Sequence, residues 1–255
     1  MLVKKYERKK KIKITFLGTS HGVPSEKRYC TAVLLEVGDS AYLIDAGAPV
    51  TDILLRKGFD LTKIKALFNT HFHMDHIAGG LHFINLCSWF FSDTDFDVYL
   101  PSDKGRKAIE ILFDAEGSKP SERIRLKNYS DDFVYDDGNI RLVPIRNAHV
   151  GDGFDSFGFC VEIGDRRILF TGDLSNDLAA DDFPKAAFDG HFDVIVSECA
   201  HFGADKLTEE IRKTDTDIFA VTHVYPFDKF AQLDKLSDSF DCTLLLAEDD
   251  DEIEF

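Results

Sequence analysis

The sequence predicts an α/β fold. Short apolar runs with the spacing of buried strands alternate along its 255 residues with stretches whose apolar positions recur at helical spacing. Side chains that can bind metals follow directly after several of the predicted strands, and α/β proteins usually bind ligands at strand ends. The hydrophobic fraction of 44% and the length allow a substantial core. We therefore expect residues 1–255 to form a single domain.

The strands are predicted from alternation and from β-branched residues. Residues 11–17 alternate between polar and apolar side chains, and the loop Gly18–Pro24, with two glycines and a proline, ends this strand. Gly38 and Asp39 mark a hairpin turn between the next two strands. The expected strands cover residues 11–17, 30–37, 41–45, 64–68, 96–100, 140–146, 157–163, 167–170, 192–197, 217–222 and 242–247.

The helices are predicted from apolar spacing and from residues typical of helix ends. Gly58 ends the first helical stretch, and Ser102 is an N-cap for a helix that reaches Phe113. The expected helices cover residues 50–57, 76–91, 103–113, 207–213 and 227–236.

Three segments do not show a regular pattern. Residues 116–139 are polar with scattered apolar side chains, and the sequence does not decide whether they contribute substrate contacts or an oligomer contact. We expect residues 1–11 to be a mobile basic arm and residues 248–255 to be a mobile acidic tail.

Composition limits the partners and the compartment. A net charge of −16 repels polyanions, so extended nucleic-acid binding is not expected, although metal ions in a site would still attract a small anionic substrate. No apolar run approaches the length of a membrane span, and the lysine-rich start lacks the apolar stretch of a secretory signal. Five cysteines without C-x-x-C spacing favour reduced thiols and a cytoplasmic protein.

The strongest functional signal is the stretch NTHFHMDH, which begins at Asn69. It contains four potential metal ligands, and they are His71, His73, Asp75 and His76. The apolar run before them predicts a strand, so His71 and His73 should project to the same side. A catalytic zinc keeps one position open for water, and four ligands exceed what one such site needs, which predicts two metal ions. The alternative is a surface loop that is rich in histidine by chance.

The letters HFHMDH resemble the H-x-H-x-D-H motif of the metallo-β-lactamase superfamily. That family has three further ligands in the order His, Asp, His, and this chain offers His149, Asp173 and His223 at these places. Asp45, in the letters LIDAG, matches the early Asp-x-Gly element of the family. The resemblance extends from about residue 14 to about residue 223 and implies a four-layer αββα sandwich with its ligands along one edge.

The resemblance also implies how the ligands divide between two divalent metal ions. One ion would be held by His71, His73 and His149, the other by Asp75, His76 and His223, and Asp173 would bridge both. Zinc suits imidazole and carboxylate best, and manganese and iron are alternatives. A histidine at position 73 distinguishes the chain from the flavodiiron oxidoreductase branch, which has glutamate there, and implies a hydrolase.

Further residues receive roles around this centre. A metal lowers the pKa of bound water to about 7, and Asp75 is expected to orient the resulting nucleophile as well as to bind metal. Asp45 is expected to orient a ligand histidine through a hydrogen bond. His201 follows a predicted strand and is the candidate general acid; the alternative is a structural histidine. Glu198 either orients His201 or pairs elsewhere.

Two features of the sequence bear on the substrate. The Gly18–Pro24 loop resembles the G-T-x-x-G-x-P loop of the branch that includes ribonuclease Z and cyclic-phosphate phosphodiesterases. Ribonuclease Z has a long tRNA-clamping arm between its third histidine ligand and its bridging aspartate, whereas only 23 residues separate His149 from Asp173. We therefore expect a small anionic phosphodiester, such as a cyclic nucleotide or a cyclic sugar phosphate.

The sequence also allows other functions, and the resemblance carries an expectation for the oligomeric state. The alternative substrates are a lactone, a thioester or a β-lactam, whose carbonyl the same metal pair would polarise. A chain of another class, a metal-binding sensor without turnover, would keep the same ligands. Relatives of this kind often form homodimers, and a homodimer is expected from the resemblance alone.

Overall fold

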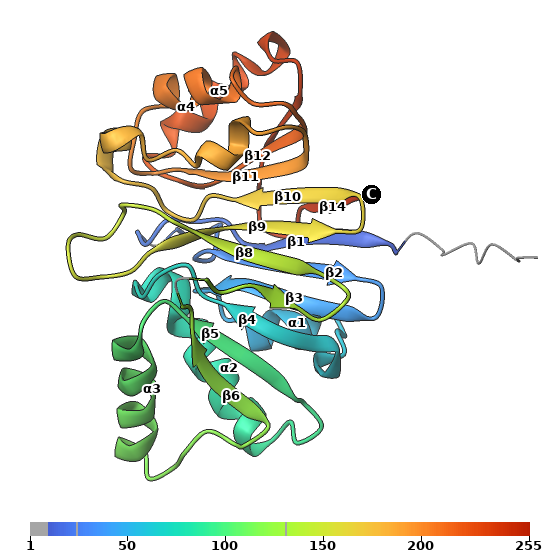
Figure 1. Ribbon diagram of the computed structural model, residues 1–255, viewed down its shortest axis with the longest axis vertical. Coiled ribbons are helices and arrows are strands. Elements are labelled where there is room, and N and C mark those ends of the chain that lie inside the picture. Colours follow the sequence, from blue (N-terminus) through green and yellow to red (C-terminus); the bar gives the residue numbers. More distant parts are fainter. Residues whose placement is uncertain (1–9, 24, 131) are drawn as a thin grey trace, which may run out of the picture.

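The computed structural model describes residues 10–23, 25–130 and 132–255. Two seven-stranded sheets pack face to face, and helices cover the outer face of each sheet (Figure 1). The expected four-layer αββα sandwich is therefore confirmed. Among the helices of the described residues, none combines the length and the apolar character needed to cross a membrane.

The N-terminal sheet has the order β14-β1-β2-β3-β4-β5-β6. Its strands are β1 (Ile12–Gly18), β2 (Ala32–Val37), β3 (Ser40–Ala46), β4 (Ile64–Phe68), β5 (Phe96–Leu100), β6 (Ile124–Asn128) and β14 (Glu252–Glu254). The helices on its outer face are α1 (Val50–Arg56), α2 (Met74–Trp89) and α3 (Asp103–Ala115).

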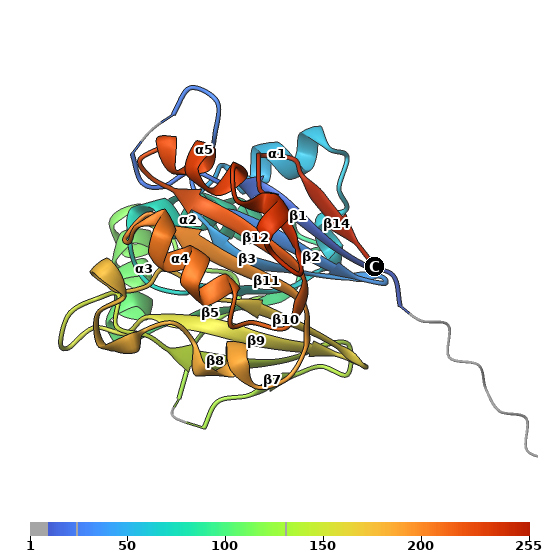
Figure 2. The ribbon, with the colours of Figure 1, turned by 90° about the horizontal axis from the view of Figure 1, so that it is seen from above.

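The C-terminal sheet has the order β13-β12-β11-β10-β9-β8-β7. Its strands are β7 (Tyr135–Asp136), β8 (Arg141–Arg146), β9 (Phe157–Ile163), β10 (Arg166–Phe170), β11 (Phe192–Cys199), β12 (Thr216–Val224) and β13 (Thr243–Leu246). The helices α4 (Ala204–Ile211) and α5 (Asp228–Asp234) lie over β11 and β12, as Figure 2 shows.

Buried apolar side chains form three layers, one between the sheets and one between each sheet and its helices. Alternation along β1 places Ile14 and Phe16 between the sheets and Leu17 against the helices. In β4, Phe68 lies between the sheets and Leu67 lies against the helices. Because both faces of each sheet are covered, the inner strands read as nearly continuous apolar runs.

Parallel pairing brings the important strand ends to one edge of the sandwich. Strands β3 to β6 pair in parallel in one sheet, and β10 to β13 pair in parallel in the other. Parallel strands end on the same side of their sheet, so the residues that follow β4, β10 and β11 and those at the end of β12 meet there.

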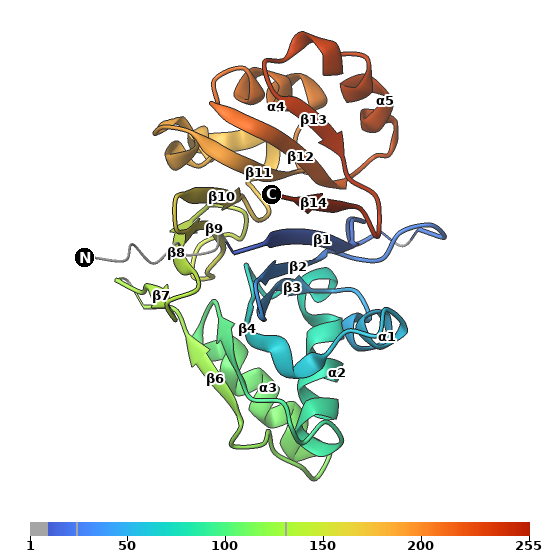
Figure 3. The same ribbon diagram turned by 90° about the vertical axis from the view of Figure 1, so that its right-hand side faces the viewer.

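The segment 248–255 is not a free tail. Glu252–Glu254 form β14, which pairs antiparallel with β1 at the edge of the N-terminal sheet (Figure 3). Ile253 is buried between the sheets, and Asp249 accepts hydrogen bonds from the backbone N–H and the hydroxyl of Thr19. The expectation of a mobile tail is wrong because backbone pairing and one buried isoleucine hold a segment whose other side chains are mostly charged.

Two other segments had no regular pattern in the sequence, and they are residues 116–139 and the basic arm. Residues 116–139 contain the edge strands β6 and β7, which the sequence did not reveal. The expected basic arm lies outside the described residues except for its end, where Lys10 donates to Asn139 and Lys11 pairs with Glu254.

Candidate metal centre

The histidine-rich stretch lies between β4 and α2. β4 ends at Phe68, α2 begins at Met74, and His73 occupies the N-cap position with extended backbone angles. His71 and His73 project to the same side, as expected, with Nε2 of His71 2.9 Å from Nδ1 of His73. Asp75 and His76 belong to the first turn of α2, where a helix presents negative and metal-binding groups to the strand end.

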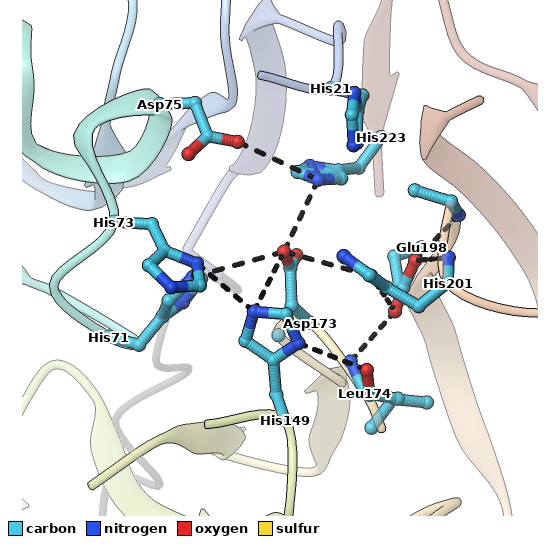
Figure 4. A network of polar contacts seen from close by, with 12 residues as sticks. His21, His71, His73, Asp75, His149, Asp173, Leu174, Glu198, His201 and His223 are labelled. Atoms are coloured by element: carbon cyan, nitrogen blue, oxygen red, sulfur yellow. Dashed lines mark hydrogen bonds and ion pairs between the residues drawn. The ribbon is translucent and has the colours of Figure 1, made fainter. Parts of the chain in front are cut away.

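The structure brings all seven predicted ligands together. His149 follows β8, Asp173 follows β10, and His223 lies near the end of β12. Several overlapping groups of these side chains have ligand atoms within 4.8 Å of one another. Two of these groups match the predicted donor sets, namely His71, His73 and His149 as the first set and Asp75, His76 and His223 as the second. Figure 4 shows the carboxylate of Asp173 in the middle, between imidazoles from both sheets.

One oxygen of Asp173 reaches both donor sets. Oδ2 lies 3.3 Å from Nε2 of His76 and 3.2 Å from Nε2 of His223. The same oxygen lies 3.7 Å from Nε2 of His149 and 3.9 Å from Nε2 of His71. This is the position that a bridging ligand needs.

The spacing of the donor atoms fits metal coordination. Ligands about 2.0–2.1 Å from a tetrahedral zinc lie about 3.3 Å from one another. In the first set, Nδ1 of His73 lies 2.9 Å from Nε2 of His71 and 3.2 Å from Nε2 of His149. In the second set, Nε2 of His76 and Nε2 of His223 are buried without a hydrogen-bond partner. Buried polar atoms rarely remain unpaired, so these two nitrogens fit metal ligation.

Four of the histidines are fixed through the nitrogen that points away from the centre. Nδ1 of His76 donates to Asp45 at 2.8 Å, and Nδ1 of His149 donates to the carbonyl of Leu174 at 3.1 Å. Nδ1 of His223 lies 3.0 Å from the hydroxyl of Thr31. For His71 the partner is the hydroxyl of Thr70, at 3.0 Å. Such contacts fix the ring orientation and leave Nε2 toward a metal.

Asp45 accepts several of the hydrogen bonds that surround the ligand histidines. Its carboxylate accepts hydrogen bonds from the backbone N–H of Thr70 at 2.8 Å and from the Thr70 hydroxyl at 2.7 Å, in addition to the imidazole of His76. Because the hydroxyl proton of Thr70 goes to Asp45, its oxygen is free to accept from His71. The predicted role of Asp45 in orienting a ligand histidine is therefore matched by its contacts.

The pKa shifts of three histidines and of Asp173 suit the binding of cations, whereas His76 must release a proton before it can bind a metal. Burial lowers the pKa of His71, His149 and His223, which favours the neutral imidazole that a metal requires. Burial would raise the pKa of Asp173, but the surrounding imidazoles hold it well below its usual range. Burial opposes a charge on His76, yet Asp173 and Asp45 raise its pKa well above the ordinary value.

Backbone conformations that are rare for side-chain-bearing residues occur at this centre. Asp45 and His223 have φ angles of 56° and 50°, in the left-handed region. Gly47 approaches α2 so closely that a Cβ atom there would lie 1.6 Å from the carbonyl oxygen of Asp75. Strain of this kind collects at functional sites, where the surrounding structure maintains it.

His201 lies beside the two donor sets, on the loop after β11. Its Nδ1 donates to the buried carboxylate of Glu198 at 2.8 Å, and its ring centre is 4.5 Å from that of His149. Burial works against protonation of His201, but the hydrogen bond and charge of Glu198 raise its pKa above the ordinary value. A histidine that carries a proton at this place can donate it to a leaving group.

An aromatic surface flanks the same centre. His21, from the loop after β1, stacks on Tyr225 with the ring centres 4.8 Å apart, and its ring centre lies 5.2 Å from that of His223. Tyr225 and Phe227 are both 37% exposed and contact each other edge to face. The described part of the Gly18–Pro24 loop thus contributes one ring to a surface that faces solvent.

Sequence reasoning did not identify several members of the site. Thr31, Thr70 and the carbonyl of Leu174 hold imidazoles, and Tyr225 stacks on His21. The positions of Thr70 and Leu174, each next to a predicted ligand, are the only signals that could have pointed to them. Thr31 and Tyr225 are brought in by folding alone.

Comparison with known proteins agrees with this geometry. Residues 12–207 match the family of the anti-Pycsar protein Apyc1. A ribonuclease Z from Exiguobacterium sp. is 30% identical over 176 residues, which are 68% of this chain and 56% of that protein. The chain thus spans little more than half the length of this curated relative.

Solved structures share the fold at low sequence identity. The metallo-β-lactamase fold protein YhfI from Bacillus subtilis superposes with a TM-score of 0.78 at 17% identity, covering 97% of this chain and 100% of that one. The short form of human tRNase Z superposes with a TM-score of 0.70 at 20% identity, covering 94% and 98%. These likenesses show that the fold is that of the metallo-β-lactamase superfamily.

Proposed function

We propose that this chain, which belongs to the family of the anti-Pycsar protein Apyc1 in the metallo-β-lactamase superfamily, is a dinuclear metal-dependent hydrolase of small phosphodiesters. The observation that carries the proposal is the pair of donor sets that lie around one oxygen of Asp173, with His201, paired with Glu198, beside them. Similarity to ribonuclease Z favours a phosphodiester over a carbonyl substrate.

The proposed division of the seven ligands between two ions follows the family resemblance. His71, His73 and His149 would hold one divalent ion, and Asp75, His76 and His223 would hold the other, with Asp173 shared. Zinc is the ion that these ligand types suit best. When bound, the two ions would supply Lewis acidity for the phosphoryl oxygen and an activated water near neutral pH.

The residues of the chain would supply orientation and a proton. Oδ2 of Asp75 lies 3.7 Å from Nε2 of His76 and 3.8 Å from Nε2 of His223, at the centre, where the carboxylate can orient the attacking water. His201 would donate its proton to the oxygen of the leaving group, and Glu198 would hold the imidazole through Nδ1.

Three features favour a small substrate. The segment between His149 and Asp173 is the tight hairpin of β9 and β10, without a clamping arm for tRNA. The net charge of −16 disfavours a long polyanion. The half-exposed ring of Tyr225, stacked on His21, offers a planar surface to a nucleobase, which favours a cyclic nucleotide among the small phosphodiesters.

Two further expectations belong to this proposal. The five cysteines are free thiols, which is consistent with a cytoplasmic location. A homodimer follows from the resemblance to dimeric relatives, and light scattering of the purified protein measures it directly.

The first test is hydrolysis of bis(p-nitrophenyl) phosphate by protein of assayed metal content, beside a p-nitrophenyl ester and a lactone. We expect turnover of the diester, and loss of this turnover in Asp75→Ala and Asp173→Asn. The matched control is Asp152→Ala, an exposed aspartate on the loop after His149, which should keep wild-type activity. A panel of cyclic nucleotides then tests the substrate class, with Tyr225→Ala expected to raise KM more than it lowers kcat.

The other outcomes select among the alternatives. Turnover of the ester or the lactone without the diester would reject a phosphodiesterase and favour a carbonyl hydrolase. Two bound ions without turnover of any of these substrates or of the cyclic nucleotides would favour a metal-binding sensor.

A further inference from the structure

We propose that Lys229 is a positioning residue that holds the loop carrying His201 and thereby aims its imidazole at the leaving group; this rests on the proposed function. Lys229 belongs to α5 and is only 9% exposed. A buried lysine is costly unless its ammonium is fully hydrogen-bonded, so its partners reveal what it stabilises.

All three partners of Lys229 are carbonyls of one short loop. Its ammonium donates to the backbone oxygens of Cys199 at 2.9 Å, Ala200 at 2.9 Å and Phe202 at 2.7 Å. These residues flank His201 on both sides. The three donors of the ammonium are thereby matched by three acceptors that no side-chain rotation can remove.

The N–H groups of the same loop are held from the other side. The carboxylate of Glu198, 2% exposed, accepts from the backbone N–H of Ala200 at 2.6 Å and of His201 at 3.1 Å. It also accepts from Nδ1 of His201 and from the backbone N–H of Leu174. The remaining carbonyl, that of His201, accepts from the backbone N–H of Asp177 at 2.9 Å.

The loop therefore lies between a buried anion and a buried cation. Glu198 fixes the imidazole and the N–H groups, whereas Lys229 fixes the carbonyls, and together they leave residues 199–202 little freedom to rotate. α5 follows the end of β12, so Lys229 also connects the loop to the strand that carries His223. Without its ammonium, we expect the imidazole of His201 to sample positions from which proton transfer is slow.

The test uses two methyl phosphodiesters that differ in their leaving group. p-Nitrophenolate leaves readily without a proton, whereas phenolate depends on a general acid. In the zinc-loaded full chain, we expect Lys229→Met to lower kcat for the phenyl ester on the order of 10–100-fold and to affect the p-nitrophenyl ester much less, with metal content and KM unchanged. Lys235→Met is the matched control, since Lys235 is an exposed lysine at the C-cap of α5, and it should retain wild-type kcat for both esters.

A double-mutant cycle separates positioning from general destabilisation. If Lys229 acts through His201, the variant His201→Ala/Lys229→Met should be no slower on the phenyl ester than His201→Ala alone. Additive losses would overturn the proposal. If Lys229→Met does not fold, Lys229→Arg replaces it: the different shape of guanidinium should lower the phenyl ester rate selectively, and a wild-type ratio of the two rates would overturn the proposal.

A spectroscopic measurement decides the proposal without turnover. The proton shared by Nδ1 of His201 and Glu198 should give a downfield, slowly exchanging NMR resonance that is kept in Lys235→Met. This resonance should be lost in Lys229→Met, or in Lys229→Arg should Lys229→Met not fold. If the wild type hydrolyses neither ester, the proposed function fails, and this resonance alone tests the positioning. Its persistence in the variant would reject the role of Lys229.

Discussion

The histidines of the centre differ in the hydrogen-bond partner of the ring nitrogen that points away from the donor sets, and Asp45 is the strongest of these partners. It is the one charged partner among the contacts to the outer nitrogens of His71, His76, His149 and His223 within the described residues, and it also binds Thr70 twice. The hydroxyl and carbonyl groups that hold the other rings are neutral. The second donor set therefore depends on a carboxylate that is not one of the seven predicted ligands.

Asp45→Asn should weaken metal binding at the second set. The amide keeps the shape of the side chain but removes the charge that supports the basicity of His76, and loss of such partners typically costs about 10–100-fold in metal affinity. Competition with a chromophoric chelator measures the zinc affinity. Asp52→Asn, on the exposed side of α1, is the control, and equal affinities for the two variants would contradict the assigned role.

Cysteine reactivity gives a prediction with a defined pH dependence. Burial raises the pKa of Cys199 to about 12 and that of Cys87 to about 11. Only the thiolate reacts, and at pH 7 about one Cys199 in 10⁵ is a thiolate, a fraction that rises tenfold with each pH unit.

In native protein at pH 7, both thiols should resist iodoacetamide for hours and react faster as the pH rises. Mass spectrometry of the labelled peptides measures the rates. Labelling in guanidinium chloride, where all five cysteines should react, is the control. Rapid native labelling of Cys199 would mean that the loop after β11 opens far more often than its contacts imply.

Among whole elements, the packing of α2 against the turn after β3 is the tightest contact of the site. A Cβ atom on Gly47 would lie 1.6 Å from the carbonyl oxygen of Asp75, and one on Gly79 would lie 1.6 Å from the carbonyl oxygen of Ala48. The start of α2 carries Asp75 and His76, so any displacement of the helix moves two predicted ligands together.

Gly47→Ala should therefore lower both stability and metal binding. The forced shift should cost about 1–3 kcal/mol, as overpacking of buried sites usually does, and should reduce the affinity of the second donor set. Urea denaturation and metal titration measure the two effects. Gly151→Ala has open space around its Cα and should be neutral in both measurements; a neutral Gly47→Ala would show that the turn can give way.

The sequence predicts a strand well when side-chain burial stabilises it, and poorly when backbone pairing at a sheet edge does. β1, β4 and β11 are covered on both faces, and their apolar runs identify them within one or two residues. β6 and β14 are edge strands, stabilised mainly by backbone pairing that leaves few marks in the side chains. Four of the predicted ligands were recognisable because the motif HFHMDH is local, and His149, Asp173 and His223 were assigned from the family resemblance. Thr31 and Lys229 act across the fold and carry no local signal.

For the molecule as a whole, the centre joins its two halves. The N-terminal sheet supplies His71, His73, Asp75 and His76, and the C-terminal sheet supplies His149, Asp173 and His223. Bound ions would therefore connect the two sheets at one edge, beyond what the apolar layer between them provides.

Removal of metal should accordingly lower the melting temperature. An ion present at 100 times its Kd stabilises the native state by about 2.7 kcal/mol, which corresponds to about 5–10 °C for a chain of this size. Thermal unfolding followed by circular dichroism, with and without chelator, measures the shift. Asp173→Asn removes the negative charge of the carboxylate between the two donor sets, so chelator should lower its melting temperature less. If chelator leaves the melting temperature of the wild type unchanged, bound ions do not connect the two sheets.

The hydrogen bonds between residues 247–251 and the loop after β1 affect when, during synthesis, the centre can take its final shape. Asp249 binds Thr19 and the backbone of Tyr29, and Arg28 reaches the carbonyl of Ala247, so the first loop of the site is fixed by a segment that is translated after all the predicted ligands. A ribosome-bound chain with His223 already outside the exit tunnel would have every predicted ligand but not yet a fixed loop. We expect the centre to acquire its final shape only after residue 251 has emerged.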